Sequence, residues 1–179
     1  TGLLEVARDI SGTLDLEDIF ERAKGHAATL LPCDRVIVFH WDAARHTIRL
    51  VSQCGVPEHL LQAAVELEYP PAPDVVQHLA SGQPNVINNR DEAQPDFREL
   101  LDVFEVGTVV FAPLHVRGRF LGALAAVRNR PGEAFDASQI QLIQGIAAQL
   151  AVAMEAADLY RIQQEETIVS RALARVGPE

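Results

Sequence analysis

Residues 108–128 read TVVFAPLHVRGRFLGALAAVR, and this stretch decides the fold. It contains two segments rich in β-branched and other apolar residues, Thr108–Val116 and Phe120–Arg128, joined by Arg117-Gly118-Arg119. This pattern predicts two strands connected by a tight turn. Because both strands are nearly apolar on both faces, we expect them to be central strands of a sheet that is covered on both sides. The arginines around Gly118 are interpreted as part of a solvated turn.

A long helix is predicted after this pair of strands. Asp136 is a capping residue, Gln139 stands at the capping-box position, and the apolar pattern continues from Ile140 to Val176, until Gly177-Pro178. A helix of about 37 residues is roughly 55 Å long, which exceeds the width of a domain of this size. Its tail is therefore expected to project from the domain.

The predicted tail carries a narrow apolar seam. Its members follow the alternating three-four spacing of a two-stranded coiled coil, with a glutamate at one seam position. An exposed seam of this kind favours a partner, either a second copy of the chain or a following domain. The seam consists of Leu159, Ile162, Glu166, Val169, Leu173 and Val176.

Residues 1–107 alternate between helical and strand patterns. Leu3–Ile10 has one apolar helical face, and a second helix is predicted from the N-cap Asp15 to Leu31, where Pro32 ends it. Further elements are predicted as strands at Arg35–Trp41, Thr47–Gln53 and Asn85–Asn88, and as short helices at Glu58–Val65, Asp74–Ser81 (capped by Asp74) and Phe97–Phe104.

The composition is that of an ordinary acidic globular domain. The 179 residues are 48% apolar and 22% charged, and the formal net charge is -10, which argues against nucleic acid or an anionic membrane as a partner. Two cysteines cannot form a disulfide framework, and no apolar run approaches the roughly 20 residues that span a bilayer. We therefore expect a cytoplasmic protein without membrane contact. Met154 is the single methionine, so we expect a piece of a longer protein.

Several motifs, in this order and spacing, resemble those of the GAF domain, a small-molecule sensor fold of signalling proteins. CDRVIVF at 33–39 is similar to the first strand of the family, and SQCGVP at 52–57 to the end of its second. GQPNVIN at 82–88, followed by Asp91, is similar to the region of its third strand. The best matches are APL at 112–114, GRFLGAL at 118–124 and the Phe135-Asp136 pair that opens the long helix.

The resemblance implies an α+β fold with a central antiparallel sheet of five or six strands. The N- and C-terminal helices would lie on one face, and short helices and loops would cover the other, as in GAF and PAS domains. The expected organisation is a connecting helix at 1–14, a GAF domain at 15–160, and a signalling helix at 161–179 that leads to a further domain.

The resemblance also implies where a pocket would lie. The strand phase of the family would turn Val109, Phe111 and Pro113 toward the pocket, and Phe97, Leu101 and Phe104 would come from the covering helix, with Asp91 near the rim. An apolar box of this kind suits either a small hydrophobic ligand or a core filled by its own side chains.

The usual ligands of the family are not expected here. The cyclic-nucleotide motif lacks its lysine and phenylalanine around Asn88–Glu92, and Phe97 occupies the position of the bilin-contacting histidine. Cys33 and Cys54 match neither of the common bilin attachment sites. Among six histidines, only His78 and His115 are candidates for haem or a metal, and neither has the spacing of a metal site. The cofactor therefore stays unknown, with haem, bilin and cyclic nucleotide all disfavoured.

The sequence analysis leads to a non-catalytic regulatory domain of a bacterial-type signalling protein, such as a two-component system. It would bind a small molecule or dimerise through its terminal helices and pass the change to an output domain of the same polypeptide. The alternatives are a ligand-free dimerisation spacer and an enzyme like the free methionine sulfoxide reductases of this family. The enzyme is disfavoured because those reductases depend on several cysteines, and here only Cys54 lies near a suitable position.

Overall fold

The computed structural model describes residues 2–176, so Thr1 and the helix stop predicted at Gly177-Pro178 lie outside the described residues. Five antiparallel strands form one sheet in the order β2-β1-β5-β4-β3. This confirms the predicted α+β class with five strands. The strands are β1 (Arg35–Asp42), β2 (Thr47–Cys54), β3 (Asn85–Ile87), β4 (Thr108–Val116) and β5 (Arg119–Arg128).

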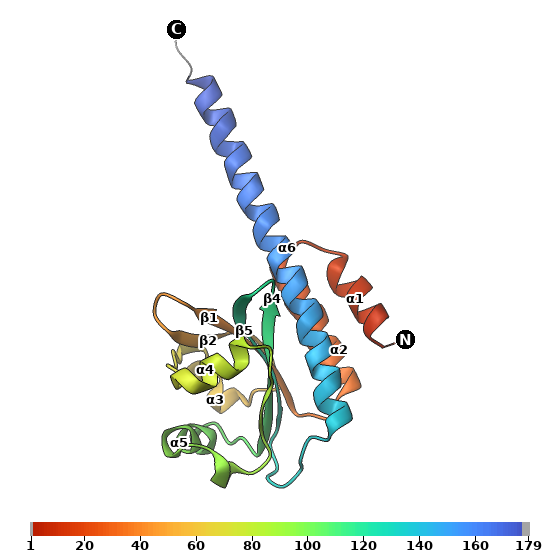
Figure 1. Ribbon diagram of the computed structural model, residues 1–179, viewed down its shortest axis with the longest axis vertical. Helices are drawn as coiled ribbons and strands as arrows, with labels where there is room; N and C mark the ends of the chain where they lie inside the picture. Colours follow the sequence, from red (N-terminus) through yellow and green to blue (C-terminus); the bar gives the residue numbers. More distant parts are fainter. Residues whose placement is uncertain (1, 177–179) are drawn as a thin grey trace.

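The helices form a layer on each face of the sheet (Figure 1). One layer contains the terminal helices and packs on the larger hydrophobic core, and the other contains the short middle helices, as predicted. The terminal helices are α1 (Leu3–Ser11), α2 (Leu16–Leu30) and α6 (Ala137–Arg175). The cover over the other face consists of α3 (Glu58–Glu66), α4 (Pro73–Ala80), the 3-10 helix η1 (Arg90–Glu92) and α5 (Pro95–Val103).

The β4–β5 pair is buried on both faces, which confirms the prediction from its sequence. Val110 and Leu114 belong to the core beneath the terminal helices, and Val109 belongs to the core on the other face. The turn that joins the strands needs left-handed backbone at two successive residues, Arg117 (φ 50°) and Gly118 (φ 76°). Two successive residues in this conformation match the twist of the strands. Glycine adopts a positive φ without steric strain, so it is the preferred residue at the second position.

The predicted helix starts are largely confirmed. The Asp15 carboxylate accepts hydrogen bonds from the backbone N–H groups of Glu17 and Asp18, and Asp136 forms a complete capping box with Gln139. The predicted cap of α4 was wrong, because the N-cap is Ala72, Pro73 is the first helical residue and Asp74 caps nothing. The start of α5 was also wrong, because this helix begins at Pro95 and not at Phe97. Proline suits that position because its φ is already helical and its missing N–H would have no partner there.

The α6 helix has 39 residues, which corresponds to roughly 58 Å. Its buried residues end at Ala157, and every residue from Leu159 to Val176 is exposed, so the second half projects away from the domain (Figure 1). An 18-residue window of α6 has a mean hydropathy of 1.3, enough by length and composition to cross a membrane. The expectation that no segment comes close was therefore wrong. Half of that window is buried against the domain, as in the core helix of a globular fold.

Candidate functional site

Two adjoining hollows lie between the sheet and its cover of short helices. The first has a volume of about 90 Å³ and is almost wholly apolar. The second, about 310 Å³, lies toward α4 and β3 and is lined by both polar and apolar groups. Helix α3 lies against β2 and helix α4 against β3, β4 and β5, so these short helices cover the sheet at separate points.

A row of aromatic rings divides the two hollows, and four residues line both: Ile48, Tyr69, Phe97 and Phe111. We call the three aromatic members, Tyr69, Phe97 and Phe111, the aromatic partition. The ring centroids of Tyr69 and Phe97 are 5.7 Å apart, and those of Phe97 and Phe111 are 6.1 Å apart. These distances are typical of favourable aromatic pairs. Side-chain rotation of Phe97 would join the hollows into one larger space.

Most of the predicted pocket residues come together at the first hollow. Val109 and Phe111 reach it from β4 because alternate residues of a strand face the same side. From α5 come Phe97, Leu101 and Phe104.

Two predicted pocket residues lie elsewhere. Pro113 is buried in β4 but does not line either hollow. Asp91 lines neither hollow, although its neighbour Glu92 lines the second. Asp91 lines a separate polar depression, because its backbone N–H is held by the Asn89 side chain within the η1 turn.

Tyr69 and Arg35 are among the residues of the first hollow that the sequence analysis missed. Tyr69 comes from the proline-rich linker, where its backbone pairs with Ile48 of β2, and burial raises the pKa of its phenol, with the Asp96 carboxylate adding to the shift. Arg35 lies at the start of β1 and is only 2% exposed. The sequence signal that could have identified Arg35 is a charged residue at the start of an otherwise apolar strand.

The cysteines lie away from both hollows. Cys33 and Cys54 pack against the core on the side of the terminal helices, and neither lines either hollow. The Nε2 atom of His78 lies 2.8 Å from the carbonyl oxygen of Pro84. Within residues 2–176, no group of three or more histidine, cysteine, aspartate or glutamate side chains is arranged to hold a metal ion.

Burial raises the pKa of the Cys33 thiol to about 11, with the nearby Cys54 adding to the shift. Because the thiolate is the reactive form, Cys33 is expected to react with iodoacetamide at pH 8 at least tenfold more slowly than an unstructured cysteine peptide. A Cys54→Ser variant leaves one thiol, and mass spectrometry over time measures its labelling. Unfolding the same variant in urea should restore the peptide rate. Rapid labelling of the folded variant would contradict the burial of this thiol.

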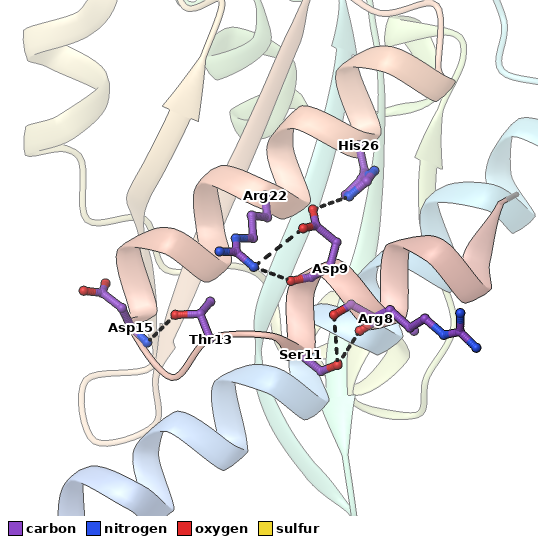
Figure 2. A network of polar contacts seen from close by, with 8 residues as sticks. Arg8, Asp9, Ser11, Thr13, Asp15, Arg22 and His26 are labelled. Carbon is purple, nitrogen blue, oxygen red and sulfur yellow. Dashed lines mark hydrogen bonds and ion pairs between the residues drawn. The ribbon is translucent and has the colours of Figure 1, made fainter.

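Hydrogen bonds and ion pairs connect α1 with α2 on the face of the sheet opposite the two hollows (Figure 2). Asp9 of α1 is the centre of this contact. Its carboxylate lies 2.8 Å from Nε2 of His26, and its backbone carbonyl accepts a hydrogen bond of 2.7 Å from Arg22. Because the groups are partly exposed, they orient α1 more than they stabilise it.

A second ion pair connects the β4–β5 turn with α6. Nε of Arg117 lies 3.3 Å from Oε1 of Glu155, whose side chain is 9% exposed whereas that of Arg117 is 80% exposed. Glu155 stands near the end of the buried half of α6, just before the helix leaves the domain. The turn and the root of the projecting helix are thus in direct contact.

The projecting half of α6 exposes the whole predicted seam. The apolar seam residues are between 44% exposed, at Ile162, and 82% exposed, at Val176. Nothing in residues 2–176 covers them. Val152, one heptad before Leu159, is also 53% exposed, so the apolar line continues onto the part of α6 that packs on the domain.

These features define a class of small α+β domains that enclose a hollow beneath short helices and carry a long terminal helix. The sequence model of the GAF domain matches residues 15–154. The chain belongs to the GAF domain family.

Comparison with known proteins places this domain among relatives in signalling proteins. A Synechocystis sp. protein named as a methyl-accepting chemotaxis protein, sll0041, is 26% identical over 175 residues, which is 96% of this chain but 17% of that protein. This chain therefore corresponds to a small part of that relative.

Two solved structures show the same fold. JSC1_58120g3, in a far-red absorbing dark state with bound biliverdin, has a TM-score of 0.75 at 19% identity, covering 88% of this chain and 99% of that one. A domain described as belonging to a two-component sensor histidine kinase from Sinorhizobium meliloti 1021 has a TM-score of 0.68 at 24% identity, covering 84% and 97%.

Proposed function

We propose that this GAF domain is a non-catalytic sensory module that binds a small molecule, dimerises through its terminal helices and signals along α6 to an output domain. The observation that carries this function is α6 itself. One half of the helix is packed on the sheet, and the other half is exposed with an apolar seam. A free-standing domain gains nothing from such a helix, whereas a parallel dimer buries the seam and joins two domains rigidly.

The hollows support the sensory part of the proposal. They lie on the face of the sheet opposite α6, so a ligand that moves β4 also moves the β4–β5 turn, which holds Glu155 through Arg117. The competing proposal is a ligand-free spacer, whose hollows would only be packing gaps. Native mass spectrometry of the purified chain separates them. A mass excess that disappears on denaturation supports the sensor, and a dimer without excess mass, unchanged by any added apolar compound, supports the spacer.

Covalent bilin, haem and catalytic roles find no support among the described residues. Neither cysteine lines either hollow, although a structural neighbour carries biliverdin. The methionine sulfoxide reductase alternative needs reactive thiols at the pocket, and the Cys33 thiol is held neutral with its pKa at about 11. We therefore propose that the domain binds neither haem nor a covalent bilin, and that it acts in the cytoplasm in a two-component or chemotaxis type of pathway.

The dimer part of the proposal is tested at Glu166, the charged member of the seam. A carboxylate buried between two helices weakens their association, and leucine would bury apolar surface in both copies instead. Glu166→Leu is therefore expected to tighten the dimer by at least about tenfold in dissociation constant, measured by sedimentation equilibrium.

Two matched variants control this measurement. Glu166→Gln removes the charge without adding apolar volume and should give a smaller gain. Gln164→Leu adds the same side chain on the outer face of the helix, two residues away, and should leave the dimer unchanged. A Glu166→Leu variant that associates no more tightly than the wild type, or no more tightly than Gln164→Leu, would contradict the seam.

A further inference from the structure

Arg35 is the one buried charged residue among those that line the first hollow. Its side chain lines the hollow and the residue is 2% exposed. The guanidinium is held from one side, because Nη1 donates to the carbonyl of Phe104 at 2.7 Å and Nη2 donates to the carbonyl of Glu105 at 2.9 Å. These two bonds fix the orientation of the group at the end of α5.

The third nitrogen of this guanidinium is left without a partner. Among residues 2–176, Nε of Arg35 is the only buried side-chain nitrogen or oxygen that makes no hydrogen bond. A buried donor without an acceptor costs roughly 1–3 kcal/mol, so such atoms are rare in folded proteins and call for an explanation.

The charge of Arg35 is also unbalanced. In the described part of the chain, the hydrogen bonds of its guanidinium go to two backbone carbonyls and not to a carboxylate, although buried guanidinium groups normally pair with one. Burial lowers the pKa of Arg35, while the more distant carboxylates of Glu105 and Asp34 act in the opposite direction. Glu105 itself points its carboxylate toward His59. The site thus holds a fixed positive charge in apolar surroundings.

Apart from Arg35, the exposed Arg49 and the phenol of Tyr69, the residues that line the first hollow are apolar. Its walls come from the aliphatic and aromatic side chains of the sheet and α5, and the aromatic partition closes the side toward the second hollow. A molecule that fits must therefore be apolar over most of its surface and carry a hydrogen-bond acceptor at one end. Nε lies just beneath the wall of the hollow, so the wall must shift slightly before an acceptor can reach it. A negatively charged acceptor would then satisfy the Nε–H group and be attracted by the positive charge.

We propose that the first hollow binds a small carboxylic acid with an aromatic or branched hydrocarbon body, whose carboxylate accepts a hydrogen bond from Nε of Arg35. This proposal rests on the sensory function proposed above and names the class of its ligand. A phosphate ester fits less well, because it carries nearly two charges and several acceptor oxygens, whereas the guanidinium of Arg35 has one donor without a partner. With a volume of about 90 Å³, the hollow admits a body of only a few carbon atoms until the aromatic partition rotates.

Benzoate and its neutral isostere nitrobenzene are the probes that test this proposal. The two molecules have the same shape, but only benzoate carries a full negative charge. We expect benzoate to bind the complete chain at least tenfold more tightly than nitrobenzene, measured by calorimetry. In the ¹⁵N-labelled protein, benzoate should shift the Nε–H resonance of Arg35, and nitrobenzene should shift it much less.

Variants assign the effect to one residue. Arg35→Lys keeps the charge but removes the Nε donor, and it should lower the affinity for benzoate at least tenfold while nitrobenzene binds as before. Arg119→Lys is the matched control, because Arg119 is exposed at the start of β5 and lines neither hollow, and it should leave both affinities unchanged. If Arg35→Lys does not fold, the Nε–H titration of the wild type still decides.

The outcomes separate this proposal from the sensory function on which it rests. Nitrobenzene binding with equal or weaker binding of benzoate would overturn the role of Arg35 while leaving a ligand-binding hollow. Benzoate binding that does not move the Nε–H resonance would overturn it as well. If neither probe nor toluene binds, both the role of Arg35 and the ligand-binding part of the sensory function fail.

Discussion

An Arg128→Met variant is expected to lose about 3 to 4 kcal/mol of unfolding free energy, a large share of the stability of a domain of this size. Arg128 ends β5 and is 7% exposed. Its Nε donates to the carbonyl of Pro32 at 2.7 Å, and Nη1 donates to the carbonyls of Glu133 and Ala134 at 2.9 and 2.7 Å. Methionine fills a similar volume but leaves these carbonyls without a donor.

The same arginine also supports the start of α6. Nη2 donates to Oε1 of Gln139, the oxygen that accepts the Asp136 backbone N–H in the capping box, and the guanidinium lies 4.1 Å from the centre of the Phe135 ring. Loss of Arg128 should therefore loosen the capping box together with the loop before it. Such a cap contributes about 1 kcal/mol by itself.

Urea denaturation followed by circular dichroism measures this effect. Arg130→Met is the matched control, because Arg130 is an exposed arginine two residues further along, and its loss should change stability by less than about 0.5 kcal/mol. The loss of unfolding free energy in Arg128→Lys should lie between those of Arg128→Met and Arg130→Met, because a lysine can donate to only some of the carbonyls that Arg128 binds. An Arg128→Met protein that unfolds at the same urea concentration as the wild type would show that the carbonyls find other donors.

A Phe111→Ala variant is expected to lose about 2 to 4 kcal/mol and to gain a binding site for toluene. Phe111 lines both hollows and belongs to the aromatic partition, and its ring centroid lies 6.1 Å from those of Phe39 and Phe97. Removing it joins the hollows into one apolar space. A large apolar cavity in a folded protein stays dry and takes up small aromatic molecules such as benzene.

Toluene binding is measured as the change in melting temperature between thermal unfolding with and without toluene. A ligand that binds only the folded state raises its stability by mass action, so toluene should raise the melting temperature of Phe111→Ala by several degrees more than that of the wild type. Phe120→Ala removes the same ring from the second hollow without touching the partition, and its response to toluene should be smaller. Equal responses in all three proteins would show that Phe111 does not separate the hollows.

Local patterns in the sequence were sufficient to predict the elements of this fold. The period-two apolar strands, the turn around Gly118 and the caps at Asp15 and Asp136 each depend on a few adjacent residues, so they could be interpreted without knowing what packs against them. The apolar stripe and the narrower seam of α6 likewise predicted one packed half and one projecting half. The error at Asp74 arose because Pro73 competes for the same helix start.

The chemistry of the hollow was decided by the tertiary structure alone. Arg35 donates to the carbonyl of a residue 69 positions away, and Arg128 donates to one 96 positions away. Neither partner is marked in the sequence, because every residue has a backbone carbonyl and only the fold decides which carbonyls are buried without a donor. For the same reason the resemblance to GAF domains implied an apolar pocket around Phe97 and Val109, but nothing in the sequence predicted the buried guanidinium in its wall. The wall is assembled from β1, the linker and α5, and only their packing brings a charge and an apolar hollow together.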